Sequence, residues 1–281
     1  YTRGDKPIGV LRIFRCLESK VLSKPSFLTR ITLKHIQRVA SQGVKYIEFY
    51  WNWTGLKHFM SYDEARQAIN EGIRQGLQRY GVVARSIPSI DREDTPEAAV
   101  ELVEEMIRHP DQYTIGIGID YRETNHEPEN FWKAFKMAKD AGFKITIHAG
   151  EFGEHWRNVE TAMKLLGADR IDHGYTIIDS PELVEEAKAA NMHFAVVPTN
   201  SYYLRTLSVE EWAIRHPVRK MVELGLKVFP NSDDPTMHHI SISESWLLMH
   251  NWLDFTLPQL RKMLERRENA GKIASSRLLL I

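Results

Sequence analysis

The chain has 281 residues, 43% of them hydrophobic and 26% charged, so it is long enough to bury a large core. Lys plus Arg and Asp plus Glu each number 37, so the formal net charge is zero. This balance excludes the basic excess that draws a protein to a polyphosphate backbone, and nucleic acid is not an expected partner.

Cysteine usage and hydropathy indicate the cellular setting. The one cysteine, Cys16, excludes an intrachain disulfide framework and suits a reducing compartment, so we expect a cytoplasmic protein. No apolar run reaches the roughly 18 residues that a membrane helix requires, and no membrane partner is expected. The chain begins at Tyr1 without an initiator methionine, and we expect that its natural N-terminus lies further upstream.

Seven apolar, β-rich runs follow one another along the chain and are predicted to be strands. They cover residues 46–51, 82–90, 113–120, 144–151, 170–175, 193–200 and 227–235. Amphipathic helical patterns separate them; the pattern at 61–81, for example, opens with Ser61 as a cap and ends at Gly81. Strands and helices that alternate at this spacing predict parallel strands.

The number of strands bears on the fold class. A closed α/β barrel needs eight strands, and a helical stretch at roughly 8–42 precedes the first of the seven. We therefore predict an α/β fold, a (β/α)8 TIM barrel, as a single domain over residues 1–281 whose first strand would lie before Tyr1. An open doubly wound sheet is the alternative, although no Gly-rich phosphate loop follows any predicted strand. The tail at 247–281 is predicted to be helical.

Polar side chains gather where the predicted strands end. They are Asp120, which follows Gly118 in the same predicted strand, His148 and Glu151, Asp172 and His173, and Asp233 and Asp234. Barrel enzymes carry their catalytic groups at the C-terminal ends of the strands, so these side chains are predicted to face one mouth. Gly150 allows the backbone to turn sharply after His148, which would bring Glu151 beside it.

Imidazole and carboxylate groups at converging strand ends suit a divalent metal, zinc first. A catalytic zinc keeps one position open for water and lowers the pKa of that water to about 7. A carboxylate close to a metal-binding histidine can then carry protons to a substrate.

Each of these residues also has a structural interpretation. His148 could be a hydrogen-bonded structural histidine, and Asp172 could cap a turn. Asp233 and Asp234 stand before a proline, which is a typical turn signal, and Glu151 could be solvated. Chance turn residues would scatter over both ends of the strands, so their recurrence at one end favours a site.

Two further features remain open between a structural and a functional interpretation. Trp51 and Trp53 lie in an aromatic run and could stack on a planar base, although packing in the core or at the barrel rim is slightly favoured. His238 and His239 follow the last predicted strand and could contact a substrate, although a place on the loop surface is favoured.

Three motifs, "TIHAGE" (146–151), "RIDHGY" (170–175) and "NSDDP" (231–235), occur in this order and resemble the adenosine deaminase family of metal-dependent amidohydrolases. "GIGID" (116–120) and "VPTNSYYLRTL" (197–207) resemble further segments of that family. The similarity runs from about Thr29 to the end of the last predicted strand.

The resemblance implies a role for each matching residue. His148 is implied as a zinc ligand, and Asp233 as both a zinc ligand and the acceptor of the water proton. Glu151 would donate a proton to the purine ring nitrogen, and His173 would orient the attacking hydroxide. For substrate binding, Asp234 would hold the five-membered ring, and the backbone of Gly118 would meet the six-membered ring.

The reaction that the resemblance implies is a hydrolytic deamination with one Zn²⁺ per subunit. Activated water attacks the carbon that bears an exocyclic amine, Glu151 protonates the adjacent ring nitrogen, and ammonia leaves. The expected substrate is a small purine-like molecule, adenosine or a related 6-aminopurine, which becomes the 6-oxo product. The protein would thus act in purine metabolism.

One feature of the chain departs from the family. The family's first strand supplies two more zinc ligands as His-x-His, and that pattern occurs nowhere in this sequence. Two alternatives therefore stand beside the purine deaminase: an amidohydrolase that acts on another C–N bond, and a non-catalytic barrel with a degenerate metal site.

Overall fold

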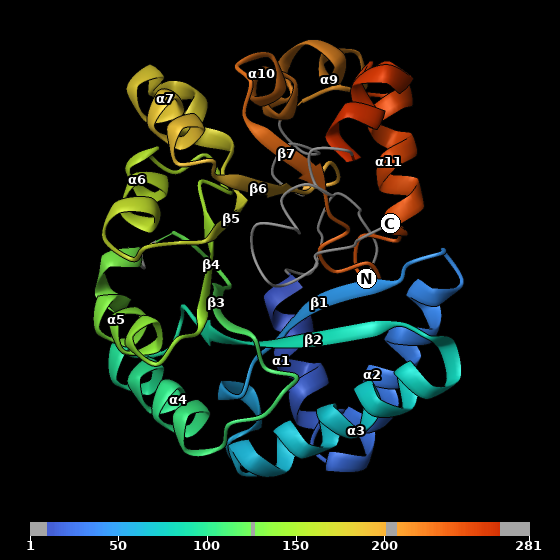
Figure 1. The fold of residues 1–281 in the computed structure, drawn as a ribbon, viewed down its shortest axis with the longest axis vertical. Coiled ribbons are helices and arrows are strands. Elements are labelled where there is room, and N and C mark those ends of the chain that lie inside the picture. The colour runs from blue at the N-terminus through green and yellow to red at the C-terminus, as the bar shows by residue number, and fades with distance from the viewer. Residues whose placement is uncertain (1–9, 125–126, 201–206, 265–281) are drawn as a thin grey trace. The chain divides into compact units, whose positions relative to one another are not determined.

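The structure is a computed structural model that describes residues 10–124, 127–200 and 207–264 (Figure 1). Its internal contacts divide the chain into two units, the first reaching Tyr121 and the second beginning at Arg122. Each unit contains parallel strands that alternate with helices along the chain.

The first unit contains three parallel strands in chain order. Its elements are α1 (Val10–Lys20), α2 (Pro25–Ala40), β1 (Tyr46–Trp51), the 3₁₀ helix η1 (Thr54–Leu56), α3 (Tyr62–Tyr80), β2 (Val83–Asp91), α4 (Pro96–Arg108) and β3 (Gly116–Asp120). The register of β1 with β2 pairs Tyr46 with Val83, and that of β2 with β3 pairs Ser89 with Gly118.

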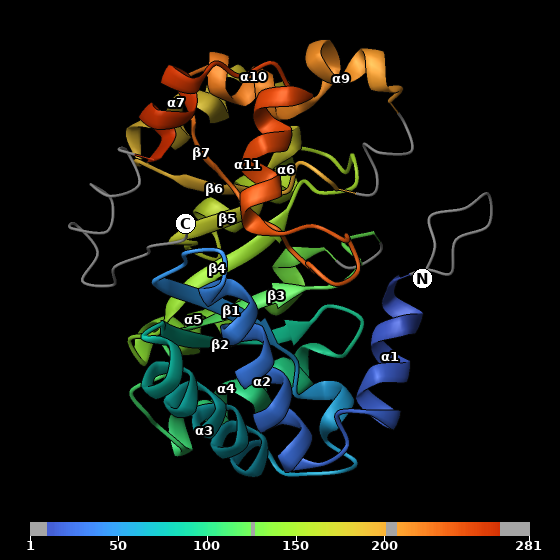
Figure 2. The ribbon, with the colours of Figure 1, turned by 90° about the vertical axis from the view of Figure 1, so that its right-hand side faces the viewer.

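Helices α2 and α3 lie side by side in both views (Figures 1 and 2). Glycines on α3 permit this close approach: a Cβ at Gly76 would lie 2.6 Å from Cδ1 of Ile36 on α2. The predicted caps of α3 are present, because Ser61 forms a capping box with Glu64, and Gly81 ends the helix with a φ of 67°.

Trp51 and Trp53 of the aromatic run pack against neighbouring residues of the first unit. The ring of Trp51 stacks on Tyr62 with centroids 5.5 Å apart. Trp53 is buried, and its indole N–H donates to the carbonyl of Met60 at 3.3 Å. These contacts favour the packing interpretation of both tryptophans.

The second unit contains four parallel strands, again in chain order. Its elements are η2 (Pro128–Phe131), α5 (Trp132–Asp140), β4 (Lys144–Ala149), α6 (Arg157–Lys164), β5 (Arg170–His173), η3 (Tyr175–Asp179), α7 (Pro181–Ala189), β6 (His193–Val196), α9 (Val209–Arg215), α10 (Pro217–Glu223), β7 (Lys227–Pro230) and α11 (Ile242–Asn251). Residues 257–264 are also helical. Ile147, Ile171 and Phe194 on three of these strands have no exposed surface, as expected for parallel strands covered on both faces.

All seven predicted strands are present, but several end earlier than the sequence pattern indicated. β6 ends at Val196 rather than at residue 200, because Pro198 lacks the N–H that a longer strand would need for its hydrogen bonds to a neighbour. β7 ends at Pro230 rather than residue 235. Residues 10–45, which the structure describes throughout, form α1 and α2 and contain no strand.

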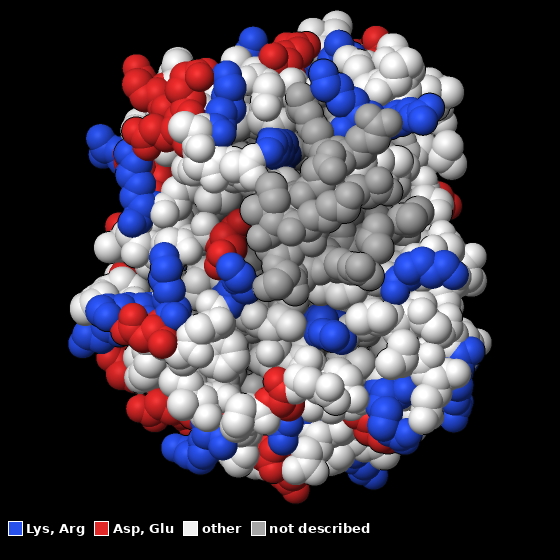
Figure 3. Space-filling view, in the orientation of Figure 1, with Lys and Arg blue, Asp and Glu red and all other residues white. Residues whose placement is uncertain are grey.

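The described residues show how charge is distributed on one face of the molecule and how apolar the helices are. On the face drawn in Figure 3, basic and acidic side chains of the described residues are interspersed. Among the described helices, none combines the length and the apolar character needed to cross a membrane.

Candidate active site

The ends of β4 and β5 place two predicted site histidines in contact. The parallel register sets His148 opposite Asp172 and Ala149 opposite His173. The imidazole ring centroids of His148 and His173 lie 4.8 Å apart, at an interplanar angle of 68°. The two residues are 8% and 1% exposed, so the pair is buried.

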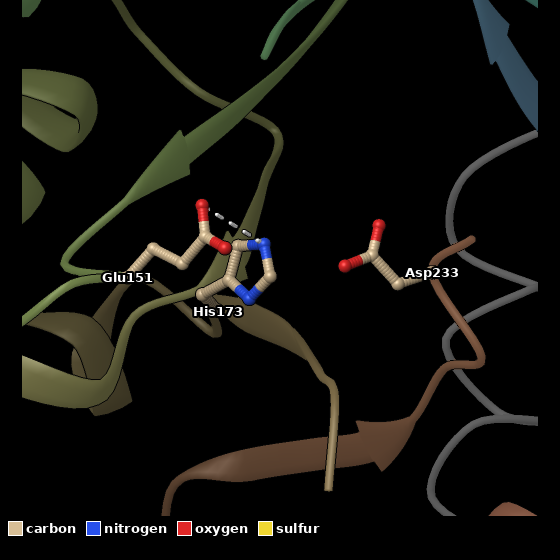
Figure 4. A group of neighbouring side chains, drawn as sticks. All are labelled: Glu151, His173 and Asp233. Carbon is tan, nitrogen blue, oxygen red and sulfur yellow. Dashed lines mark ion pairs between the residues drawn. The ribbon is translucent and has the colours of Figure 1, made fainter. Parts of the chain in front are cut away.

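Two carboxylates approach His173 from different parts of the chain (Figure 4). Ligand atoms of Glu151, His173 and Asp233 all lie within 4.8 Å of one another. Oε2 of Glu151 lies 3.6 Å from Nε2 of His173. Figure 4 shows the Glu151 and Asp233 carboxylates on either side of the imidazole ring. The structure thus brings together the three residues predicted to be catalytic.

The backbone takes an unusual form at these positions. His173 has a φ of 70° and Asp233 a φ of 53°, which is the left-handed region that non-glycine residues seldom adopt. Gly150, with a φ of 68°, makes the turn after β4 that the sequence predicted. Left-handed backbone at non-glycine residues is concentrated at functional sites, which supports this location for the site.

His173 is held in its neutral form. Burial, and after it the neighbouring His148, lowers the pKa of His173 to about 3. Nδ1 of His173 lies 3.4 Å from the hydroxyl of Tyr175, which donates its own proton to the carbonyl of Val197 at 3.0 Å. Nδ1 must therefore be the donor, so Nε2 presents a lone pair toward Glu151.

A buried carboxylate lies beside His148. Its Nδ1 lies 3.6 Å from Oδ2 of Asp172. Asp172 also accepts from the hydroxyl of Thr146 at 2.7 Å and from Nε of Arg170 at 3.1 Å. Asp172 is thus a buried partner of His148 and not a turn cap, an arrangement typical of histidines that bind metals.

A short segment after β6 supports the Glu151 carboxyl. Nδ2 of Asn200, which is 1% exposed, donates to Oε1 of Glu151 at 3.1 Å. This segment belongs to the "VPTNSYYLRTL" motif, but no role was predicted for Asn200 itself. The rest of the predicted motif, residues 201–206, lies outside the described residues.

The same segment holds His238 near Asp233. Nδ1 of His238 lies 2.9 Å from the hydroxyl and 3.1 Å from the carbonyl of Thr199. Its Nε2 lies 3.7 Å from Oδ2 of Asp233, and its side chain is 11% exposed. The expected loop-surface position therefore holds for His239, which is exposed, but not for His238, whose imidazole contacts Thr199 and lies beside Asp233.

Glu123 also contacts the cluster and was missed by the sequence analysis. It follows β3, is 2% exposed, and accepts from the backbone N–H groups of Gly150 and Glu151 at 2.7 and 2.8 Å. It accepts a third hydrogen bond from Nδ2 of Asn158 at 2.9 Å. No local pattern marks this residue, because all of its partners are distant in sequence.

The two predicted substrate-binding residues have different surroundings. Asp234 has a carboxylate oxygen within 4.8 Å of ligand atoms of both Asp233 and His238. Gly118 lies on β3 of the first unit, where a Cβ would come within 2.3 Å of the Tyr50 ring. Close packing therefore suffices to explain this glycine, and its contact with substrate stays a prediction.

The donor set of the second unit fits a divalent metal. Imidazole nitrogens and carboxylate oxygens are the ligands that zinc takes in catalytic sites. His148 has the Asp172 carboxylate behind it, and Asp233 contributes a carboxylate to the buried cluster. Among the described residues, Asp233 belongs to both groups whose ligand atoms lie within 4.8 Å of one another, whereas His148 belongs to neither, so His148 stays a predicted metal ligand.

Comparison with known proteins places the chain in a family. The family model described as adenosine deaminase matches residues 10–274. The adenine deaminase of Marinomonas sp. (strain MWYL1) is 31% identical over 209 residues, covering 73% of this chain and 60% of that protein. The adenosine deaminase of Clostridium botulinum (strain Langeland) is 28% identical over 244 residues, 86% of this chain and 71% of that protein. The chain spans about 60% of the length of the first curated relatives.

Solved structures agree with this assignment. An amidohydrolase from Burkholderia ambifaria with bound Zn is 47% identical, with a TM-score of 0.93 over 98% of this chain and 79% of that one. The adenine deaminase of Arthrobacter aurescens is 22% identical, with a TM-score of 0.83 over 92% of this chain and 77% of that one. The predicted α/β barrel class is thereby confirmed. The chain belongs to the adenosine deaminase family.

Proposed function

We propose that this chain is the catalytic part of a hydrolytic deaminase that converts a 6-aminopurine, adenosine or a close relative, to its 6-oxo product and ammonia. The observation that carries the proposal is the group of buried Glu151 and His173 with the partly exposed Asp233, whose ligand atoms lie within 4.8 Å of one another. The names of the curated relatives, adenine and adenosine deaminase, support the same reaction class.

We infer that His148 and Asp233 would hold a zinc ion. When bound, zinc acts as a Lewis acid and makes a water molecule acidic enough to lose a proton near neutral pH. The relative from Burkholderia ambifaria, which was solved with bound Zn, supports zinc over other divalent metals.

The protein side chains would share the proton transfers. The Asp233 carboxylate accepts a proton from the attacking water, and Nε2 of His173, which is neutral, accepts a hydrogen bond that orients that water. Glu151 donates its proton to the ring nitrogen beside the carbon under attack, which makes that carbon electrophilic. The proton on Asp233 then passes to the amine, which leaves as ammonia, and the proton of the new hydroxyl restores the acid form of Glu151 as the carbonyl forms.

The remaining predicted residues would hold the purine. We assign Asp234 to the five-membered ring and the backbone of Gly118 to the six-membered ring. Fixing the ring against Glu151 would lower the barrier by orientation as well as by charge.

A screen for ammonia release tests the proposal. The zinc-loaded protein is assayed with adenosine, adenine, pterins and cyclic amides, and formation of the 6-oxo purine is followed by its change in ultraviolet absorbance. We expect turnover of at least one 6-aminopurine. Turnover confined to the other compounds would instead identify an amidohydrolase of another C–N bond. Absence of both turnover and stoichiometric zinc would identify a non-catalytic barrel.

A further inference from the structure

Glu123 lies behind the turn that carries Glu151. Its two carboxylate oxygens accept from consecutive backbone N–H groups, Oε1 from Gly150 at 2.7 Å and Oε2 from Glu151 at 2.8 Å. Asn158 adds a third donor at 2.9 Å. A carboxylate with 2% exposure is costly to bury unless it is hydrogen-bonded, and these three donors satisfy it.

The turn is also confined by packing. Gly150 has a φ of 68°, and a Cβ there would meet Oγ1 of Thr176 at 2.6 Å and Cγ2 of Val159 at 2.9 Å. These side chains therefore pack closely on the turn whose N–H groups the Glu123 carboxylate binds. Because one of the N–H groups that Glu123 binds belongs to Glu151 itself, Glu123 fixes the point from which the Glu151 side chain starts.

A carboxylate that binds two backbone N–H groups can also be a purely structural turn cap, and the chain contains such a case for comparison. Oδ1 of Asp111 accepts from the N–H groups of Tyr113 and Thr114 at 2.6 and 2.8 Å, just before β3. Neither of these residues belongs to the site. Asp111 also pairs with Arg66 at 2.9 Å, whereas the backbone that Glu123 holds belongs to a residue of the candidate active site.

We propose that Glu123 is a positioning residue, which holds the Gly150–Glu151 turn so that the Glu151 carboxyl reaches the substrate at the geometry needed for proton donation. This inference rests on the proposed deaminase function. A misplacement of about 1 Å can lower a rate about 100-fold, so loss of the contact would be expressed in kcat.

The test is the variant Glu123→Gln in the zinc-loaded protein. Gln keeps the size of the side chain but replaces one acceptor oxygen with an NH₂ group. This group would face a backbone N–H and cannot accept a hydrogen bond from it. We expect kcat to fall roughly 10- to 100-fold, with KM within about threefold of the wild type and zinc content unchanged. Deuterium exchange of the Gly150 and Glu151 amides should also become faster.

Two further variants separate positioning from stability. Glu123→Asp keeps the charge but shortens the side chain by one methylene, and we expect it to retain more of kcat than the Gln variant. Asp111→Asn, the matched control, should lower the melting temperature while kcat and exchange at Gly150 and Glu151 stay unchanged.

The outcomes are distinguishable. If the wild type deaminates a purine and Glu123→Gln retains kcat within threefold, the inference is overturned and the proposed function stands. If Glu123→Gln folds poorly, Glu123→Asp decides: the inference is overturned if this variant is folded and its Gly150 and Glu151 amides exchange faster than in the wild type while kcat is unchanged. If the wild type turns over no aminopurine, the proposed function is wrong, and the positioning role of Glu123 in that reaction is wrong with it.

Discussion

Glu151 is held at both ends by different partners, its backbone N–H by Glu123 and its Oε1 by Asn200. Neither partner is predicted to bind the metal. We therefore expect Glu151→Gln, which keeps the shape but removes the acid, to lower kcat by about 10² to 10⁴-fold. Zinc content, measured by atomic emission, should equal that of the wild type, and a variant with a near-normal rate would refute the assigned role.

Asp233 and Asp234 are adjacent but have separate predicted roles, so they form a matched pair. Asp233→Ala should lose both zinc and turnover, because it removes a ligand as well as the acceptor of the water proton. Asp234→Ala should keep its zinc and raise KM. Metal analysis of the two variants, with steady-state kinetics, measures the difference. Full zinc occupancy in Asp233→Ala would show that Asp233 is not a ligand.

The turn after β4 illustrates, at the level of elements, what a sequence can predict. The strand, its end near His148 and the need for Gly150 followed from local pattern and backbone sterics, and the structure contains all three. The contacts of Glu123 and Asn200 with this turn could not be predicted from the sequence, because each residue forms hydrogen bonds to residues 27 or more positions away. Such contacts depend on which strands are neighbours in the sheet and on their register, and a local sequence pattern does not specify either.

Helix α10 begins with a buried histidine whose protonation should affect stability. Nδ1 of His216 accepts from the N–H of Val218 at 3.4 Å. Burial lowers the pKa of His216 to about 4, against 6.5 for the free side chain, although a hydrogen bond with the backbone of Pro198 partly offsets this. The unfolded chain therefore takes up this proton first as the pH falls, so stability is complete above pH 6.5 and declines toward pH 4.

The variant His216→Asn tests this linkage, because Asn can cap a helix but does not titrate. Between pH 7.5 and pH 5, His216 should account for about 2 kcal/mol of the wild type's loss in free energy of unfolding. Urea denaturation at both pH values measures the free energy of unfolding. Its decrease from pH 7.5 to pH 5 should be smaller in the variant than in the wild type by that amount. Equal losses in the two proteins would mean that His216 is protonated in the folded state.

For the whole molecule, the fold and the metal site should be separable. The strand residues that form the interior, such as Ile117 and Ile147, are fully buried apolar side chains that need no metal. Dialysis against a chelator should therefore abolish ammonia release while the far-ultraviolet circular dichroism spectrum persists, and added zinc should restore turnover. Undiminished turnover after verified removal of the metal would contradict a zinc-dependent reaction.

The four residues from Val197 to Asn200 act as a common anchor for the cluster. They bind Tyr175, which touches His173; they bind His238, which lies beside Asp233; and they bind Glu151 directly. An insertion or a shift in this segment would therefore displace Glu151, His173 and Asp233 together. Laboratory evolution of new substrate preferences should therefore leave these four positions unchanged and accumulate its substitutions elsewhere along the chain.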